Sequence, residues 1–151
     1  MTPETDLALL LDERAISRVV HGFCLAVDAR DMDAVRACYW PEAIDDHDFV
    51  TGGPEVLVEW LERTLPRHVS TMHHLGALQI DVEGEVATAV STVMAVHVGT
   101  PVDDPRRNFV AAGRYHDRFE RRDGQWRIIH RHAAGEWFTP STAVPIAQRS
   151  S

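Results

Sequence analysis

A carboxylate and an imidazole stand at positions where the hydrophobic pattern of this sequence calls for apolar residues. Asp28 comes four residues after Cys24 and eight after Val20, so it shares the apolar stripe of a predicted helix. His74 has the same parity as Met72 along a predicted strand, so it is expected to face inward. Because a buried charge needs a partner, we expect the carboxylate and the imidazole to hydrogen-bond each other.

Such a pair could carry general-base chemistry. The carboxylate accepts the proton of one ring nitrogen and leaves the other nitrogen free to take a proton from a substrate. The sequence also allows other interpretations of these two residues. Asp28 could lie past the helix end in solvent or cap the following turn, and His74 could be a satisfied core histidine. Its neighbour His73 is expected to point to the other face of the sheet.

Other polar residues could also face the interior. The alternation of the last predicted strand places Arg131 on the concave face, although a surface position fits as well. His130 and His132 project from the opposite face and could join His73 or Glu136 as zinc ligands. Histidines on the outer face or at an interface fit the sequence better, so we expect no metal site.

The elements that must position these groups change type near residue 70. Apolar residues first recur at helical spacing and then at every second position. The predicted helices span 12–29, with 7–11 as first turns, then a segment capped by Asp31 that ends before Pro41, and a third from Pro54 to before Pro66. The predicted strands span 70–82, 86–99, 108–122 and 125–138, with turns at 83–84 and 123–124 and a loop at 101–105.

Helices followed by a strand meander predict an α+β fold in which three N-terminal helices pack on one face of a curved antiparallel sheet. One domain over residues 1–140 is expected, with 141–151 as a flexible or exchanged tail. A chain of 151 residues can enclose a pocket without disulfides or a structural metal. Cys24 and Cys38 lie fourteen residues apart without a C-x-x-C pattern, and Cys24 falls on the apolar stripe of the first helix, so both are expected as reduced, buried thiols.

The charge balance excludes several function classes. All 15 basic residues are Arg, against 23 acidic ones, for a formal net charge of −8. This balance argues against nucleic acid and anionic membranes as partners. The absence of Lys excludes Schiff-base chemistry and a P-loop lysine. With no signal-peptide pattern and no long apolar run, we expect a cytoplasmic protein.

Four segments of the chain resemble a known family over roughly residues 12–140. They are L-A-V-D at 25–28, M-H-H-L-G at 72–76, E-R-R-D-G-Q-W-R-I at 120–128 and H-R-H-A-A-G-E-W-F-T-P at 130–140. The chain resembles the SnoaL-like branch of the nuclear-transport-factor-2-like superfamily, and within it the lindane dehydrochlorinase, scytalone dehydratase and bile acid 7α-dehydratase group. The resemblance implies a cone-shaped α+β barrel.

The resemblance also implies roles for residues. In that group a histidine removes a proton from carbon, an aspartate orients it, and an arginine on the last strand assists the leaving group or carbonyl; these roles fall on His74, Asp28 and Arg131. The chain departs from the group at Phe23, where relatives have lysine or tyrosine. Asp45, His47 or Tyr115 could supply a different polar contact, although His47 also fits a solvated loop.

Together these features predict a cofactor-independent lyase, of the dehydratase type, or an isomerase, acting on an apolar, ring-containing small molecule. Its pocket is expected to be lined by aromatic, Met and polar residues: Phe23, Trp40, Asp45, His47, Trp60, Met72, Met94, Tyr115 and Trp137. A non-catalytic binding protein or accessory subunit is the alternative, and an epoxide hydrolase using Asp45 or Asp117 is a third. A homo-oligomer, dimer or trimer, is expected through the outer sheet face.

Overall fold

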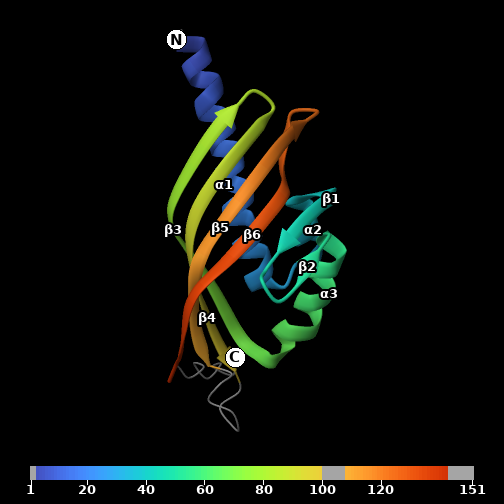
Figure 1. Ribbon diagram of the computed structural model, residues 1–151, viewed down its shortest axis with the longest axis vertical. Helices are drawn as coiled ribbons and strands as arrows, with labels where there is room; N and C mark the ends of the chain where they lie inside the picture. The colour runs from blue at the N-terminus through green and yellow to red at the C-terminus, as the bar shows by residue number, and fades with distance from the viewer. Residues whose placement is uncertain (1–2, 100–107, 143–151) are drawn as a thin grey trace, which may run out of the picture.

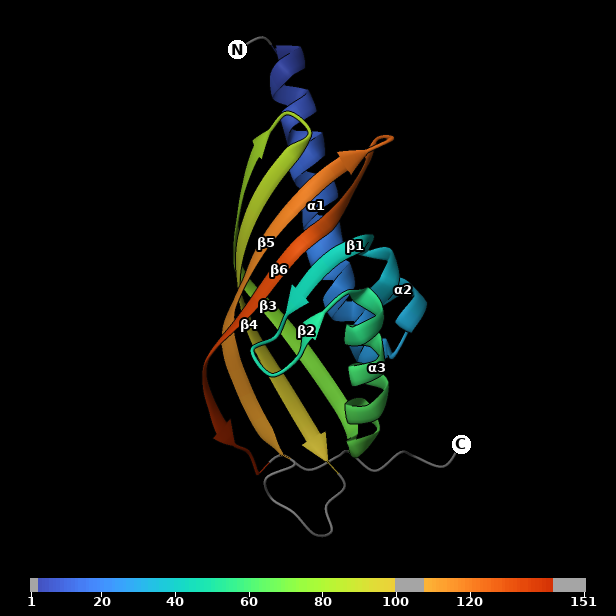
Figure 2. The same ribbon diagram turned by 45° about the vertical axis from the view of Figure 1, so that its right-hand side comes forward.

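The computed structural model describes residues 3–99 and 108–142. Three helices, α1 (Pro3–Ala29), α2 (Met32–Ala37) and α3 (Pro54–Thr64), lie on one side of a six-stranded sheet (Figures 1 and 2). The strands are β1 (Tyr39–Asp46), β2 (Thr51–Gly52), β3 (His68–Glu83), β4 (Val86–Gly99), β5 (Phe109–Arg122) and β6 (Gln125–Pro140). A short 3-10 helix, Leu65–Arg67, joins α3 to β3.

The predicted α+β fold, with three helices packed on a curved sheet, is confirmed, with two corrections. The strand order is β2-β1-β6-β5-β4-β3, and β1 runs parallel to β6, so the sheet is mixed rather than antiparallel. The sheet is also not closed into a barrel, since β2 and β3 are its two edges. The result is an open α+β cone wrapped around the helices.

The helices lie where the sequence predicts them, except that α1 begins at Pro3, earlier than the predicted first turns at 7–11. The Asp31 side chain caps α2 by accepting a hydrogen bond from the Ala34 backbone N–H at 3.0 Å. Pro54 opens α3, because the first turn of a helix needs no N–H donor there. The sequence prediction missed β1 and β2, because Pro41 and a run of acidic residues are atypical of strands.

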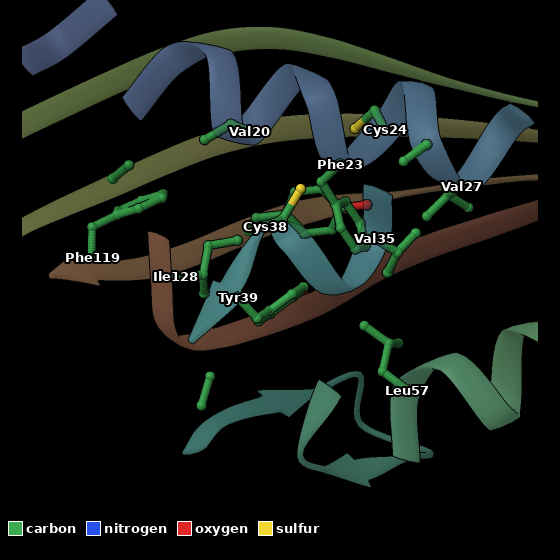
Figure 3. Packing of buried hydrophobic residues seen from close by; sticks show 14 of the residues in the cluster. Val20, Phe23, Cys24, Val27, Val35, Cys38, Tyr39, Leu57, Phe119 and Ile128 are labelled. Carbon is green, nitrogen blue, oxygen red and sulfur yellow. The ribbon is translucent and has the colours of Figure 1, made fainter. Parts of the chain in front are cut away.

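The core lies between α1 and the sheet. Figure 3 shows Phe23 of α1 near Tyr39 of β1, and Val27 of α1 near Val35 of α2. The Phe23 and Tyr39 rings meet edge to face, with centroids 5.9 Å apart. Cys24 and Cys38 are free, buried thiols, as predicted, and burial raises the pKa of Cys24 to about 12 and that of Cys38 to about 11.

Two predictions lie largely outside the described residues, namely the 101–105 loop and the tail at 141–151. Within the described part of the chain, no helix is long and apolar enough to cross a membrane.

Candidate functional site

Along strand β3, the residues that face inward change from odd-numbered to even-numbered. Its pairing with β4 shifts between Leu75 and Leu78, where Gly76 and Ala77 form an irregularity. A bulge adds one residue and exchanges the two faces of the strand beyond it. Leu78 and its even-numbered successors face inward after the bulge, whereas the odd-numbered residues face inward before it. The prediction that His74 faces inward is therefore wrong, and His73 takes that position.

Asp28 does have a histidine partner, and it is His73. The ring Nδ1 of His73 lies 2.7 Å from Asp28 Oδ1, and the backbone N–H of His73 donates to Oδ2 at 2.8 Å. The Thr71 hydroxyl donates to Oδ1 at 2.9 Å. Burial acts to raise the pKa of Asp28, but the hydrogen bonds from His73 and Thr71 outweigh it and hold that pKa below its usual value.

The end of α1 holds Asp28 against β3. Arg30 adopts a left-handed conformation, with φ of 58°, and its N–H donates to the Val27 carbonyl while Asp31 N–H donates to that of Ala26. These bonds form a Schellman-type helix end. The Arg30 guanidinium then donates to the backbone carbonyl of His68, at the start of β3. The carboxylate of Asp28 is thus fixed beside the strand that carries His73.

His73 lines a cavity of about 560 Å³, whose other lining residues come from α1, α3, the 47–49 segment and β3 to β6. Phe23, Trp60 and Tyr115 contribute aromatic walls, and His47 a polar group, as predicted for these four residues. The imidazole of His73 is 11% exposed, and within residues 3–99 and 108–142 no hydrogen bond reaches its Nε2. One nitrogen is therefore held by Asp28, and the other is free beside a space of ligand size.

Two further histidines that the sequence analysis did not single out line the cavity beside His73. The His97 ring lies 5.8 Å from that of His73 and 4.9 Å from that of His68, and it stacks on Phe109 at 4.3 Å. Burial lowers the pKa of His97 to about 4, and the nearby His73 and His68 act in the same direction. His97 is therefore neutral at pH 7.

Four residues predicted to face the interior lie on the outer face of the sheet. His74 is opposite Met94 on β4, and the row continues across the sheet to Trp137 on β6; all three line a shallow outer hollow. Met72 precedes His74 by two residues and is exposed on the same face. A second irregularity, between Ala112 and Gly113, exchanges the faces of β6 and turns Trp137 outward.

Trp40 and Asp45 do not line the cavity either. The indole of Trp40 lies between the guanidinium groups of Arg122 and Arg127, 4.7 and 4.8 Å from them, and donates to the Glu120 carbonyl. Asp45 is 1% exposed and lies behind the cavity wall, where it holds His47. The prediction that each contacts substrate is corrected because both side chains are engaged elsewhere.

Arg131 points inward as predicted but does not reach the cavity. It is fully buried, forms two hydrogen bonds of 2.7 Å with Asp117, and its guanidinium carbon lies 4.3 Å from the ring centre of Phe23 and 4.2 Å from that of Tyr115. Its charge is thus neutralised behind the aromatic wall. The predicted contact with developing substrate charge is therefore corrected. Asp117 is likewise unavailable to attack an epoxide, since Arg131 occupies both of its oxygens.

The structure also separates the histidines considered as zinc ligands. His73 bonds to Asp28 on the inner face, whereas His132 lies 3.1 Å from Asp48. Among the described residues, no group of three or more His, Cys, Asp or Glu side chains is arranged to hold a metal ion.

The open α+β cone, with three helices packed against a six-stranded mixed sheet, is the fold of the nuclear-transport-factor-2-like superfamily. The SnoaL-like domain model matches residues 8–132, so the chain belongs to the SnoaL-like family.

Several relatives match nearly the whole chain. The gamma-hexachlorocyclohexane dehydrochlorinase of Sphingobium indicum is 25% identical over 147 residues, which cover 95% of this chain and 92% of the relative. The crystal structure of LinA matches with a TM-score of 0.82 at 25% identity, over 95% of this chain and 99% of LinA. The crystal structure of the LinA-type3 hexachlorocyclohexane dehydrochlorinase of Novosphingobium barchaimii matches with a TM-score of 0.80 at 22% identity, over 95% of this chain and 99% of that chain. At this identity the match supports the fold alone.

Proposed function

We propose that this protein is a cofactor-independent lyase that carries out a dehydratase-type elimination on an apolar, ring-containing small molecule, with His73 as its general base. The observation that carries the proposal is the free Nε2 of His73 beside a cavity of about 560 Å³, while its Nδ1 is bound to Asp28. The similarity to a dehydrochlorinase supports a lyase, since such an enzyme also performs an elimination.

In the proposed reaction, Nε2 of His73 takes a proton from a carbon next to a ring carbonyl. The electron pair of the C–H bond forms a C=C bond as the leaving group departs from the next carbon. Asp28 stabilises the imidazolium and keeps the ring oriented, so it acts as a positioning residue. A base of this kind typically contributes about 10²–10⁴-fold in rate.

A binding protein without chemistry is the alternative. In a purely structural pair both ring nitrogens would bond to protein. The free Nε2 of His73 therefore favours a catalytic role over a structural one.

The test compares the two adjacent histidines. Elimination from 3-hydroxycyclohexanone and from the bicyclic 3-hydroxydecalin-1-one is followed by the absorbance of the conjugated enone. His73→Gln is expected to slow the reaction by about 10²–10⁴-fold, whereas His74→Gln, on the outer face, is the matched control and stays within about threefold of wild type, since it lies outside the proton-transfer geometry. A His73→Gln protein of wild-type activity, or wild-type protein inactive on both compounds, overturns the proposal.

We also propose that the chain forms a homo-oligomer through the outer face of its sheet. The exposed Met72, Met94 and Trp137 on that face support this, since exposed apolar clusters mark association sites. Light scattering after size-exclusion chromatography is expected to give a multiple of 16.9 kDa; a 16.9 kDa monomer overturns it.

A further inference from the structure

A second histidine–carboxylate pair lies at the cavity wall, with its histidine lining the cavity and its carboxylate buried behind it. His47, which follows β1, forms a hydrogen bond through Nδ1 with Asp45, and its side chain is 15% exposed at the cavity wall. The His47 ring lies 6.2 Å from that of Trp60 and 6.3 Å from that of Tyr115. Among the described residues, no hydrogen bond reaches its Nε2. This nitrogen is available to a ligand in the same way as Nε2 of His73.

A buried network holds the carboxylate of this second pair. The Tyr39 hydroxyl donates to Asp45 Oδ2 at 2.6 Å, and the Arg131 guanidinium lies 3.5 Å from the Tyr39 oxygen. Arg131 is itself fixed by its two bonds to Asp117. Because Asp45 is shielded from water, its attraction for a positive charge on His47 is weakly screened.

The two pairs lie at opposite ends of the sheet. His73 is on the edge strand β3, whereas β1, which His47 follows, pairs with the other edge strand, β2 (Figure 2). The sheet curves around the helices, so both histidines line one cavity from different walls. A molecule between them would meet a free imidazole nitrogen from each side.

We infer that His47 is the general acid that protonates the departing hydroxyl group of the substrate. This inference rests on the proposed function. His73 takes the α-proton, the C–H pair forms the C=C bond, and the C–O bond breaks as the His47 imidazolium gives its proton to the oxygen. Water leaves, His47 becomes neutral and His73 carries the proton, and exchange of protons with solvent resets both groups.

A general acid opposite the base indicates that the leaving group of the substrate is a hydroxyl group. Hydroxide is strongly basic and departs readily only when it is protonated, whereas chloride or acetate departs as a stable anion. An acid opposite the base is therefore useful to a dehydratase and unnecessary for the loss of a stable anion.

The experiment compares two leaving groups on one ring, 3-hydroxycyclohexanone and 3-acetoxycyclohexanone, which give the same enone. His47→Gln is expected to slow loss of water by about 10²–10⁴-fold and loss of acetate by less than about threefold. Asp45→Asn is expected to slow loss of water by less than His47→Gln does and to leave loss of acetate nearly unchanged. His116→Gln, exposed on the outer face, is the matched control and changes neither.

The outcomes separate the two proposals. Loss of neither reaction in His47→Gln, or equal loss of both in a His47→Gln protein whose circular dichroism and thermal unfolding match those of wild type, overturns the role of His47 and leaves the function of His73 standing. Retention of both reactions by His73→Gln overturns the proposed function and this inference with it. If His47→Gln does not fold, Asp45→Asn carries the comparison: a slower loss of water with an unchanged loss of acetate supports the role of His47, and equal effects on both reactions, or none, overturn it.

Discussion

The two walls of the cavity present the same pair of side chains in different surroundings. On the first wall, Asp28 is 21% exposed, and it receives all its hydrogen bonds directly from β3. On the second wall, Asp45 is 1% exposed and is the end of a chain of contacts through Tyr39 and Arg131 to Asp117. A histidine and a carboxylate are thus not a unit with fixed properties, because burial decides how strongly the partners act on each other.

The largest effect is expected where the second wall is most buried. Arg131→Met leaves Asp117 as an unpaired buried charge and should lower the free energy of unfolding by about 3–5 kcal/mol, as measured by denaturant titration. The double variant Asp117→Leu, Arg131→Met removes both charges and should recover much of this loss. A single variant that costs less than about 1 kcal/mol would contradict the assignment of a buried, paired Arg131.

A smaller effect is expected from acid on the first wall. The pKa of His97 is lowered to about 4 in the folded protein, against an ordinary value of 6.5, so the unfolded chain binds the proton more tightly. Stability should therefore fall as pH drops from about 6.5 to 4, and His97 should account for roughly 2–3 kcal/mol of that fall.

The matching variant is His97→Leu. Its free energy of unfolding should decline less steeply than that of wild type over this pH window, because no imidazole must be kept neutral. Identical slopes for the two proteins would show that His97 is not held neutral by its surroundings.

The smallest effects come from removing one hydroxyl from each wall. Tyr39→Phe takes a donor from the buried Asp45 and is expected to cost about 1–3 kcal/mol. Thr71→Val takes a donor from Asp28, which water still reaches, and is expected to cost about 0.5–1.5 kcal/mol. Thermal unfolding of both variants measures the difference, and a larger cost for Thr71→Val would reverse the ranking of the two walls.

Local periodicity predicted the carboxylate of the first wall but not its histidine. The apolar stripe of α1 singled out Asp28, and the four long strands were placed close to their observed bounds. The wrong neighbour was chosen on β3 because alternation was carried through the bulge at residues 76 and 77. Gly76 is the signal that could have corrected this, since an isolated glycine within a strand pattern suggests a bulge.

The second wall depends on contacts that no local pattern contains. An unbulged hairpin at 123–124 would place Arg131 opposite His116, and an irregularity near Ile128 instead sets it opposite Asp117. The parallel pairing of β1 with β6 brings Asp45 alongside Arg131, far apart in sequence. Long-range register, rather than residue type, therefore decides which polar groups meet.

The most direct test of the central claim is proton exchange without elimination. Cyclohexanone has no leaving group, so its α-deuterium uptake in D₂O, followed by proton NMR, reports only the base on the first wall. Wild type, His74→Gln and His47→Gln are expected to catalyse this exchange, and His73→Gln is not. Exchange by His73→Gln at the wild-type rate, or its loss in His74→Gln alone, would contradict the assignment of His73 as the base.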